Sequence, residues 1–124
     1  YCATDDCGRV INPLLASGQV HGGVVQGLGQ ALYEHAVYDD DGQLVSGSFM
    51  DYAMPRADQV ADVAVDFNEV LDPNNELGVK GIGEGGACAA PSAVVNAVLD
   101  AMACRGVETI DMPMTPLRVW QALQ

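Results

Sequence analysis

Apolar residues occupy every fourth position in one part of the chain, at Val20, Val24, Leu28 and Leu32. This period predicts a helix over residues 19–37. The same segment contains several glycines, namely Gly22, Gly23, Gly27 and Gly29. Each interior glycine costs about 1 kcal/mol of helix stability relative to alanine. The glycines therefore indicate that this helix packs very closely against another backbone or against a flat cofactor.

Shorter patterns predict the remaining elements. Residues 62–67 alternate polar and apolar, as in a half-buried strand, and residues 1–4 also have the character of a strand. Asp41-Gly42 is typical of a hairpin turn. A second apolar helix face follows Pro91, and a short helix follows Thr115-Pro116. We therefore predict an α+β fold with about four to six short strands in a mixed sheet, two main helices and a short C-terminal helix.

Length, charge and cysteine spacing narrow the class of protein. A chain of 124 residues corresponds to one domain, and no apolar run is long enough to predict a membrane span. The 5 basic and 17 acidic residues give a net charge of −12, which disfavours nucleic-acid binding. No secretory signal opens the chain, so we expect a cytoplasmic protein with free thiols. The four cysteines lack the close pairs of zinc and iron–sulfur sites, and we predict no metal ligands among the side chains.

The candidate chemistry lies in Lys80-Gly81-Ile82-Gly83-Glu84-Gly85-Gly86, which sets one carboxylate among four glycines. Glycines let a backbone approach a ligand closely, and a carboxylate held on such a loop, away from water, is suited to proton transfer. The plainer alternative is a tight turn with a solvated glutamate at its tip. The same glycines match the G-x-G-x-x-G pattern of dinucleotide-binding proteins. We disfavour that interpretation because neither Asp100 nor Glu108 lies where the acidic residue of that fingerprint is needed.

Five ordered segments together resemble one family. They are Asp5-Asp6-Cys7-Gly8-Arg9-Val10-Ile11-Asn12-Pro13, Gly18-Gln19-Val20-His21-Gly22-Gly23, Gln26-Gly27-Leu28-Gly29-Gln30-Ala31-Leu32, Gly47-Ser48-Phe49-Met50-Asp51-Tyr52-Ala53-Met54-Pro55 and Leu77-Gly78-Val79-Lys80-Gly81-Ile82-Gly83-Glu84-Gly85-Gly86. This succession resembles the C-terminal part of the large, molybdopterin-binding subunit of molybdenum hydroxylases. The resemblance is strongest to the aerobic carbon monoxide dehydrogenase type within the xanthine dehydrogenase and aldehyde oxidase family. Residues 1–124 would then be a C-terminal piece of a molybdopterin-binding domain.

The resemblance implies roles for particular residues. Glu84 falls on the family's active-site base, which serves the oxidation of a carbon centre with oxygen derived from water. Gln19 falls on the position whose amide hydrogen-bonds the pterin; capping of the helix N-terminus is its structural alternative. The backbone of Lys80, Gly81, Ile82 and Gly83 is expected to lie against the cofactor. Asp6 and Arg9 match a family turn, and we interpret them as an ion pair or as turn stabilisers.

The resemblance also implies cofactors and partners. Family enzymes hold molybdenum in molybdopterin, in some cases as its cytosine dinucleotide, and pass electrons to 2Fe-2S clusters and FAD on partner subunits. The expected partners are the rest of the large subunit, an FAD-binding medium subunit and an iron–sulfur small subunit. We expect the isolated piece to bind no cofactor and to be inactive. The alternative function is a non-catalytic assembly module that dimerises or swaps domains; carbon monoxide, aldehydes, purines and N-heterocycles all remain open as substrates.

Overall fold

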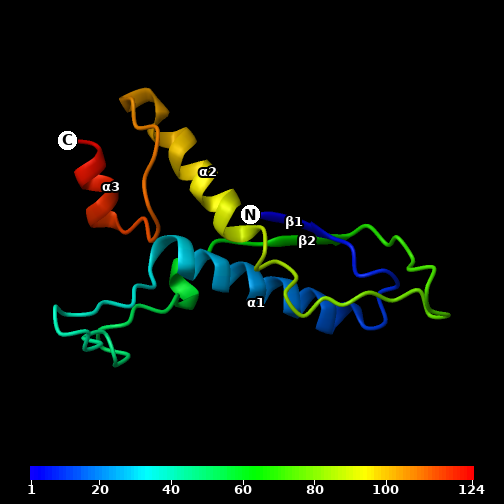
Figure 1. Cartoon of the computed structure of the whole chain (residues 1–124). Coiled ribbons are helices and arrows are strands. Elements are labelled where there is room, and N and C mark those ends of the chain that lie inside the picture. Colours follow the sequence, from blue (N-terminus) through cyan, green and yellow to red (C-terminus); the bar gives the residue numbers. More distant parts are fainter.

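Two helices and a small parallel sheet form the body of the chain in the computed structural model, which describes residues 1–124. The strands are β1 (Cys2–Asp5) and β2 (Ala64–Phe67), paired in parallel with Cys2 opposite Ala64. The helices are α1 (Pro13–Leu32), α2 (Ala90–Met102) and α3 (Pro116–Ala122), with short 3-10 turns η1 (Ala57–Gln59) and η2 (Ala103–Arg105). The sheet lies along α1, and α2 rises from it with α3 alongside (Figure 1). None of these helices is both long and apolar enough to cross a membrane.

The α+β class, the two main helices and the short C-terminal helix are confirmed. The expected number of strands is wrong, because only two segments find a pairing partner over several residues. The hairpin turn at Asp41-Gly42 is present, and it is flanked by a single antiparallel bridge between Tyr38 and Leu44. A second isolated bridge joins Gly8 to Val79. Each of these segments forms only one isolated bridge and no continuous sheet pairing. The sequence pattern alone therefore predicted too many strands.

Helix α1 begins at Pro13 rather than at Gln19. Asn12 caps it, because its side-chain oxygen accepts a hydrogen bond from the Leu15 backbone N–H at 3.1 Å. Proline at the first helical position adds no unsatisfied donor. The apolar pattern did not predict residues 13–18 as helix, because Leu14 and Leu15 are exposed and do not belong to the buried face of α1. Helix α1 also ends earlier than expected, at Leu32.

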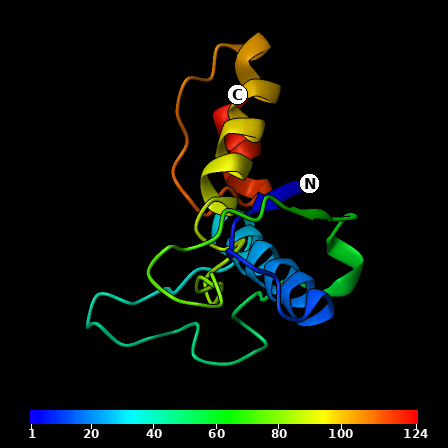
Figure 2. The ribbon, with the colours of Figure 1, turned by 90° about the vertical axis from the view of Figure 1, so that its right-hand side faces the viewer.

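The core consists of two small clusters along the line where α1 meets α2. Val20, Val24 and Ala90 are fully buried in the first, and the β-sheet residues pack against them. Ala31, Val94 and Met114 form the second, which α3 covers. Figure 2 shows α2 rising above α1, and the segment that follows α1 loops out to one side of this body. The core is thus built on α1, and the other elements pack around it.

Glycines bring the backbone of α1 into direct contact with the segment before α2. A Cβ on Gly23 would lie 2.1 Å from the Gly85 carbonyl oxygen, and one on Gly27 would lie 2.6 Å from the Ala90 Cβ. On the other side of the contact, Gly86 has φ +81°, and a Cβ there would lie 2.4 Å from the Val20 carbonyl oxygen. The expectation of close backbone packing is therefore confirmed for Gly23 and Gly27. Gly22 differs, since its Cβ would meet nothing within 4 Å.

This contrast makes Gly22 and Gly23 a matched pair for mutation. We expect Gly23→Ala to lower the free energy of unfolding by about 1–3 kcal/mol, because the methyl group collides with backbone that cannot rotate away. Gly22→Ala should raise it by up to about 1 kcal/mol, as alanine favours the helix. Chemical denaturation followed by circular dichroism measures both. Equal effects of the two substitutions would contradict the packing described above.

Candidate functional site

The segment Lys80–Ala89, called here the glutamate loop, runs along one face of α1 and leads into α2. The two segments keep the same order: Gln19 contacts Gly83, Gly23 lies against Gly85 and Ala87, and Gly27 reaches the start of α2. Within the loop, the Gly85 N–H donates to the Ile82 carbonyl at 3.0 Å. The backbone that the glycine-rich helix packs against is therefore that of the glutamate loop.

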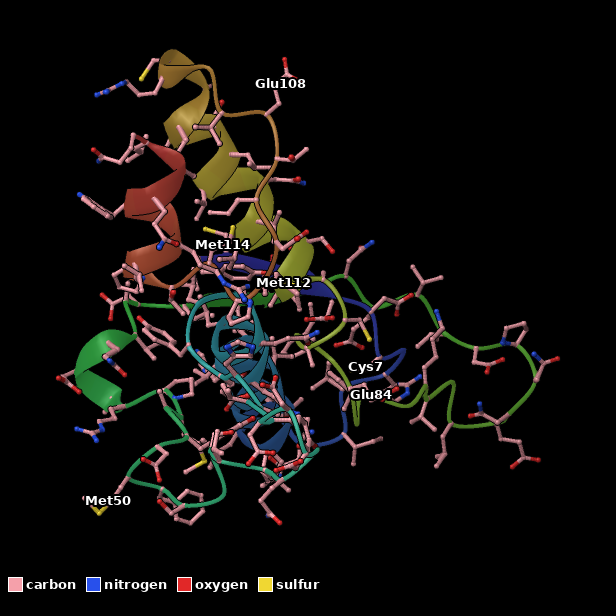
Figure 3. The ribbon with its side chains drawn as sticks, turned by 60° about the vertical axis from the view of Figure 1, so that its left-hand side comes forward. Cys7, Met50, Glu84, Glu108, Met112 and Met114 are labelled. Atoms are coloured by element: carbon pink, nitrogen blue, oxygen red, sulfur yellow. The ribbon has the colours of Figure 1, made fainter.

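Glu84 lies on the side of the loop that faces β1. It borders an open hollow of about 670 Å³ together with strand residues Cys2, Ala3, Thr4 and Asp5 and loop residues Gly81, Gly83, Gly85, Gly86, Cys88 and Ala89. The Glu84 side chain is exposed in this chain, so the expectation that it lies away from water is wrong for these 124 residues. Figure 3 shows it on the loop near Cys7, far from Glu108. No lysine, arginine or histidine borders the hollow, and Glu84 has no ion-pair partner.

The other residues predicted for the site lie around Glu84 on both sides of the loop. Gly81 and Gly83 share its hollow, and a Cβ on either would meet nothing within 4 Å. Gln19, Lys80 and Ile82 border a second hollow of about 320 Å³, and Gly83 borders both. Ile82 also packs against the first core cluster, which anchors the loop. The structure thus brings all six predicted residues together around one loop.

Gln19 makes a specific contact with this loop. Its Nε2 donates a hydrogen bond to the Gly83 carbonyl oxygen at 2.6 Å. Gln19 lies in the second turn of α1, and Asn12 occupies the cap position, so the alternative that Gln19 caps the helix is wrong. The hydrogen bond also leaves the Gln19 Oε1 acceptor without a protein partner. Gln19 therefore joins the helix to the loop and keeps one polar atom available.

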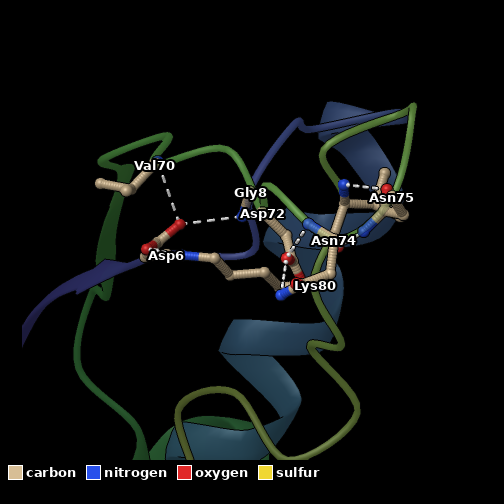
Figure 4. Close-up of polar contacts among 8 residues, drawn as sticks. Asp6, Gly8, Val70, Asp72, Asn74, Asn75 and Lys80 are labelled. Atoms are coloured by element: carbon tan, nitrogen blue, oxygen red, sulfur yellow. Dashed lines mark hydrogen bonds and ion pairs between the residues drawn. The ribbon is translucent and has the colours of Figure 1, made fainter.

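Asp6 holds the start of the glutamate loop in place (Figure 4). Its carboxylate accepts hydrogen bonds from the Gly8 N–H at 2.8 Å and the Val70 N–H at 3.1 Å, and it pairs with the Lys80 Nζ at 2.5 Å. The Lys80 hydrogen bond, followed by the Gly8 N–H, lowers the pKa of Asp6 below its ordinary value. Arg9 instead donates to the Leu77 carbonyl at 2.9 Å. The two residues therefore stabilise turns, as expected, but they do not pair with each other.

The lowered pKa of Asp6 predicts a pH dependence of stability. A carboxyl whose pKa is lower in the folded protein stabilises the fold above its ordinary value of 3.8, and this contribution is lost as the pH falls through the folded pKa. We expect Asp6→Asn to be less stable than the wild type at neutral pH, with a difference that narrows below pH 3.8. Urea unfolding across the acid range measures the difference. Asp40→Asn is the control, since the Asp40 carboxylate, unlike that of Asp6, makes no hydrogen bond or ion pair. A stability difference for Asp6→Asn that stays constant with pH would contradict the prediction.

Sequence reasoning missed two contributions to the site. Strand β1 forms one wall of the larger hollow, and the sequence carries no signal for this beyond the strand itself. Cys88 borders the same hollow and is exposed, as are Cys2 and Cys104, whereas only Cys7 is buried. The expectation of free thiols is confirmed for all four cysteines. No three His, Cys, Asp or Glu side chains converge as metal ligands.

Known proteins resemble this chain both in sequence and in structure. A family model for the molybdopterin cofactor-binding domain matches residues 1–61. The chain is 42% identical, over 100% of its length and 16% of the relative's, to the gamma subunit of the 6-hydroxypseudooxynicotine dehydrogenase complex of Paenarthrobacter nicotinovorans. It is 36% identical to the carbon monoxide dehydrogenase large chain of Hydrogenophaga pseudoflava, over 100% of its length and 15% of the relative's. The crystal structure of quinoline 2-oxidoreductase from Pseudomonas putida 86 superposes with a TM-score of 0.94 at 42% identity, over 98% of this chain and 16% of that one.

The fold and the arrangement of helix and loop therefore define a segment of a molybdopterin-binding domain. The chain spans about one sixth of the length of the curated relatives. It is a molybdopterin-binding fragment of the family that contains the carbon monoxide dehydrogenase large chain and the xanthine dehydrogenase molybdenum-binding subunit.

Proposed function

We propose that this chain supplies the base, Glu84, and part of the molybdopterin pocket of a molybdenum hydroxylase that oxidises a carbon centre with oxygen from water. The observation that carries the proposal is the position of Glu84. It is the one carboxylate on a loop of small residues, it borders a hollow, and it has no ion-pair partner. A general base must be able to approach the proton that it takes, and the glycines beside Glu84 leave that approach open.

The residues around Glu84 fit the expected cofactor. Gly81 and Gly83 present bare backbone with room in front of it, which suits a flat group lying against the loop. Gln19 keeps a free amide oxygen beside Gly83, and a pterin ring offers donors to such an acceptor. When bound, the molybdenum cofactor would supply the oxidising centre and accept the electrons.

Within that pocket, the chain's own residues would hold and move one proton. Glu84 would accept the proton from the attacking water-derived oxygen and later release it to solvent. The Lys80–Asp6 pair and the Ile82 side chain would fix the loop at its start, so that the Glu84 carboxylate keeps its orientation. Glu84 is exposed in this chain, and the rest of the large subunit would cover it and exclude water from the reaction.

The central test is Glu84→Gln in the complete enzyme, assembled with the rest of the large subunit and its partner subunits. The amide keeps the shape of the side chain but cannot accept the proton. We expect molybdenum content to stay near the wild-type value and turnover to fall by about 100- to 10,000-fold, the range for loss of a general base. Metal analysis and steady-state kinetics measure the two quantities.

Glu108→Gln is the matched control, because Glu108 is exposed in the connection between α2 and α3, away from the glutamate loop (Figure 3). This variant should keep full turnover. Wild-type turnover in Glu84→Gln would remove Glu84 from the mechanism and with it the proposed function.

The cofactor set and the partners of the complete enzyme belong to the same proposal. We expect molybdopterin, including its cytosine dinucleotide form, on the large subunit, with FAD and 2Fe-2S clusters on a medium and a small subunit in the cytoplasm. The names of two relatives support the existence of partner subunits, since one is the gamma subunit of a complex and the other is a large chain. Co-purification of flavin and iron with the assembled large subunit tests the expectation.

For the substrate we propose an aromatic nitrogen heterocycle in preference to carbon monoxide. The relatives whose names indicate quinoline and a nicotine derivative are each 42% identical to this chain, and the carbon monoxide dehydrogenase is 36% identical. We expect the assembled enzyme to reduce an artificial electron acceptor with quinoline or a nicotine derivative and not with carbon monoxide. Turnover with carbon monoxide alone would reverse the assignment and restore the carbon monoxide dehydrogenase type.

A second candidate function is a non-catalytic assembly module. Exposed apolar side chains on the segment between α1 and β2 favour it, with Phe49 80% and Met50 97% exposed. Such a surface also suits contact with the rest of a large subunit. The Glu84→Gln experiment separates the two functions, because an assembly module would bind its partners normally and show no loss of turnover.

A further inference from the structure

We infer that Gln19 is a positioning residue for Glu84, acting through the carbonyl group of Gly83. This goes beyond the pterin contact implied for Gln19 and rests on the proposed role of Glu84 as the base. The Gly83 carbonyl and the Glu84 N–H belong to the same peptide unit. A hydrogen bond to that carbonyl therefore fixes the plane from which the Glu84 side chain projects.

The Gln19 bond to Gly83, at 2.6 Å, is the only side-chain hydrogen bond between α1 and the glutamate loop. The other contacts along this face are apolar or close backbone packing, at Ile82 against the core valines, at Gly23 against Gly85 and at Gly86 against Val20. Gly81 and Gly83 have open space where a Cβ would be, so side-chain packing does not restrain them. Glycine also has the widest choice of backbone angles. The peptide between Gly83 and Glu84 is therefore held by the turn that the Gly85 N–H closes on the Ile82 carbonyl and by the hydrogen bond from Gln19.

Helix α1 is a suitable support for this contact. Gln19 is followed by the fully buried Val20, so the helix is fixed by the core at the position next to the amide. Farther along the loop, the Ala87 N–H donates to the Glu84 carbonyl at 3.2 Å. Glu84 is therefore held on both sides, by Gln19 before it and by the first turn toward α2 after it. Loss of the Gln19 donor would release one side only.

The test is amide hydrogen exchange of the large subunit made without cofactor, in a host that cannot synthesise molybdopterin. Gln19→Met keeps the length of the side chain and removes the donor. We expect the Gly85 amide, whose hydrogen bond to the Ile82 carbonyl spans Gly83 and Glu84, to exchange about two- to tenfold faster than in the wild type. Gln19→Lys retains a donor on a long side chain and should restore much of the protection. The α2 amides serve as the internal reference and should exchange at the wild-type rate.

Gln30→Met is the matched control, because Gln30 is exposed on the same helix and its side chain makes no hydrogen bond. It should leave loop exchange unchanged. Wild-type exchange in cofactor-free Gln19→Met would overturn the inference and leave Gln19 as a cofactor contact alone. Equal acceleration in the loop and in α2 would also overturn it, since that indicates a general loss of stability.

The exchange experiment tests the positioning role of Gln19, and the kinetics of Glu84→Gln test the role of Glu84 as the base. Either proposal can be contradicted without the other. If Glu84→Gln turns over normally while Gln19→Met loosens the loop, the proposed base is wrong and the positioning contact stands. If Glu84→Gln loses turnover and Gln19→Met leaves the loop protected, the base stands and the positioning role is wrong.

Discussion

Direct contact between two backbones determines this structure. Helix α1 and the glutamate loop approach so closely that a methyl group at Gly23 would overlap the Gly85 carbonyl oxygen, and one at Gly86 would overlap the Val20 carbonyl oxygen. The cost of glycine inside a helix is offset by the packing that it permits. Because α1 also carries the buried valines of the core, the loop is attached to the element around which the core is built. The position of Glu84 follows from that attachment.

The site divides into a part that this chain fixes and a part that it leaves open. Asp6, Lys80 and Ile82 hold the beginning of the loop, and Gln19 holds its middle. The side of the loop that faces β1 is a broad hollow with no cation and with Glu84 exposed at its edge. Such an arrangement presents a carboxylate in a fixed place and leaves its surroundings to be completed by other groups. This agrees with a chain that spans about one sixth of the length of its relatives.

Much of this could be predicted from the sequence, for reasons that differ between elements. The apolar period of Val20 and Val24 reflects a real buried face, and the glycines of α1 correctly indicated contact with another backbone. The extra strands were wrong because alternation describes exposure and does not show whether a partner strand exists. The pairing of Asp6 with Lys80 joins residues 74 positions apart, and no local pattern indicates it. The exposure of Glu84 was missed because burial depends on what covers the loop.

The parallel course of α1 and the glutamate loop limits which changes of length the chain can accept. An α-helix turns about 100° per residue. One residue inserted between Gln19 and Gly27 would therefore rotate every later glycine away from the loop. Residues with larger side chains would then face the loop in place of the glycines. Substitutions on the outer side of α1 leave this spacing intact, whereas a single insertion or deletion would separate helix from loop along its whole length. The interval between these residues is thus as much a part of the site as the residues themselves.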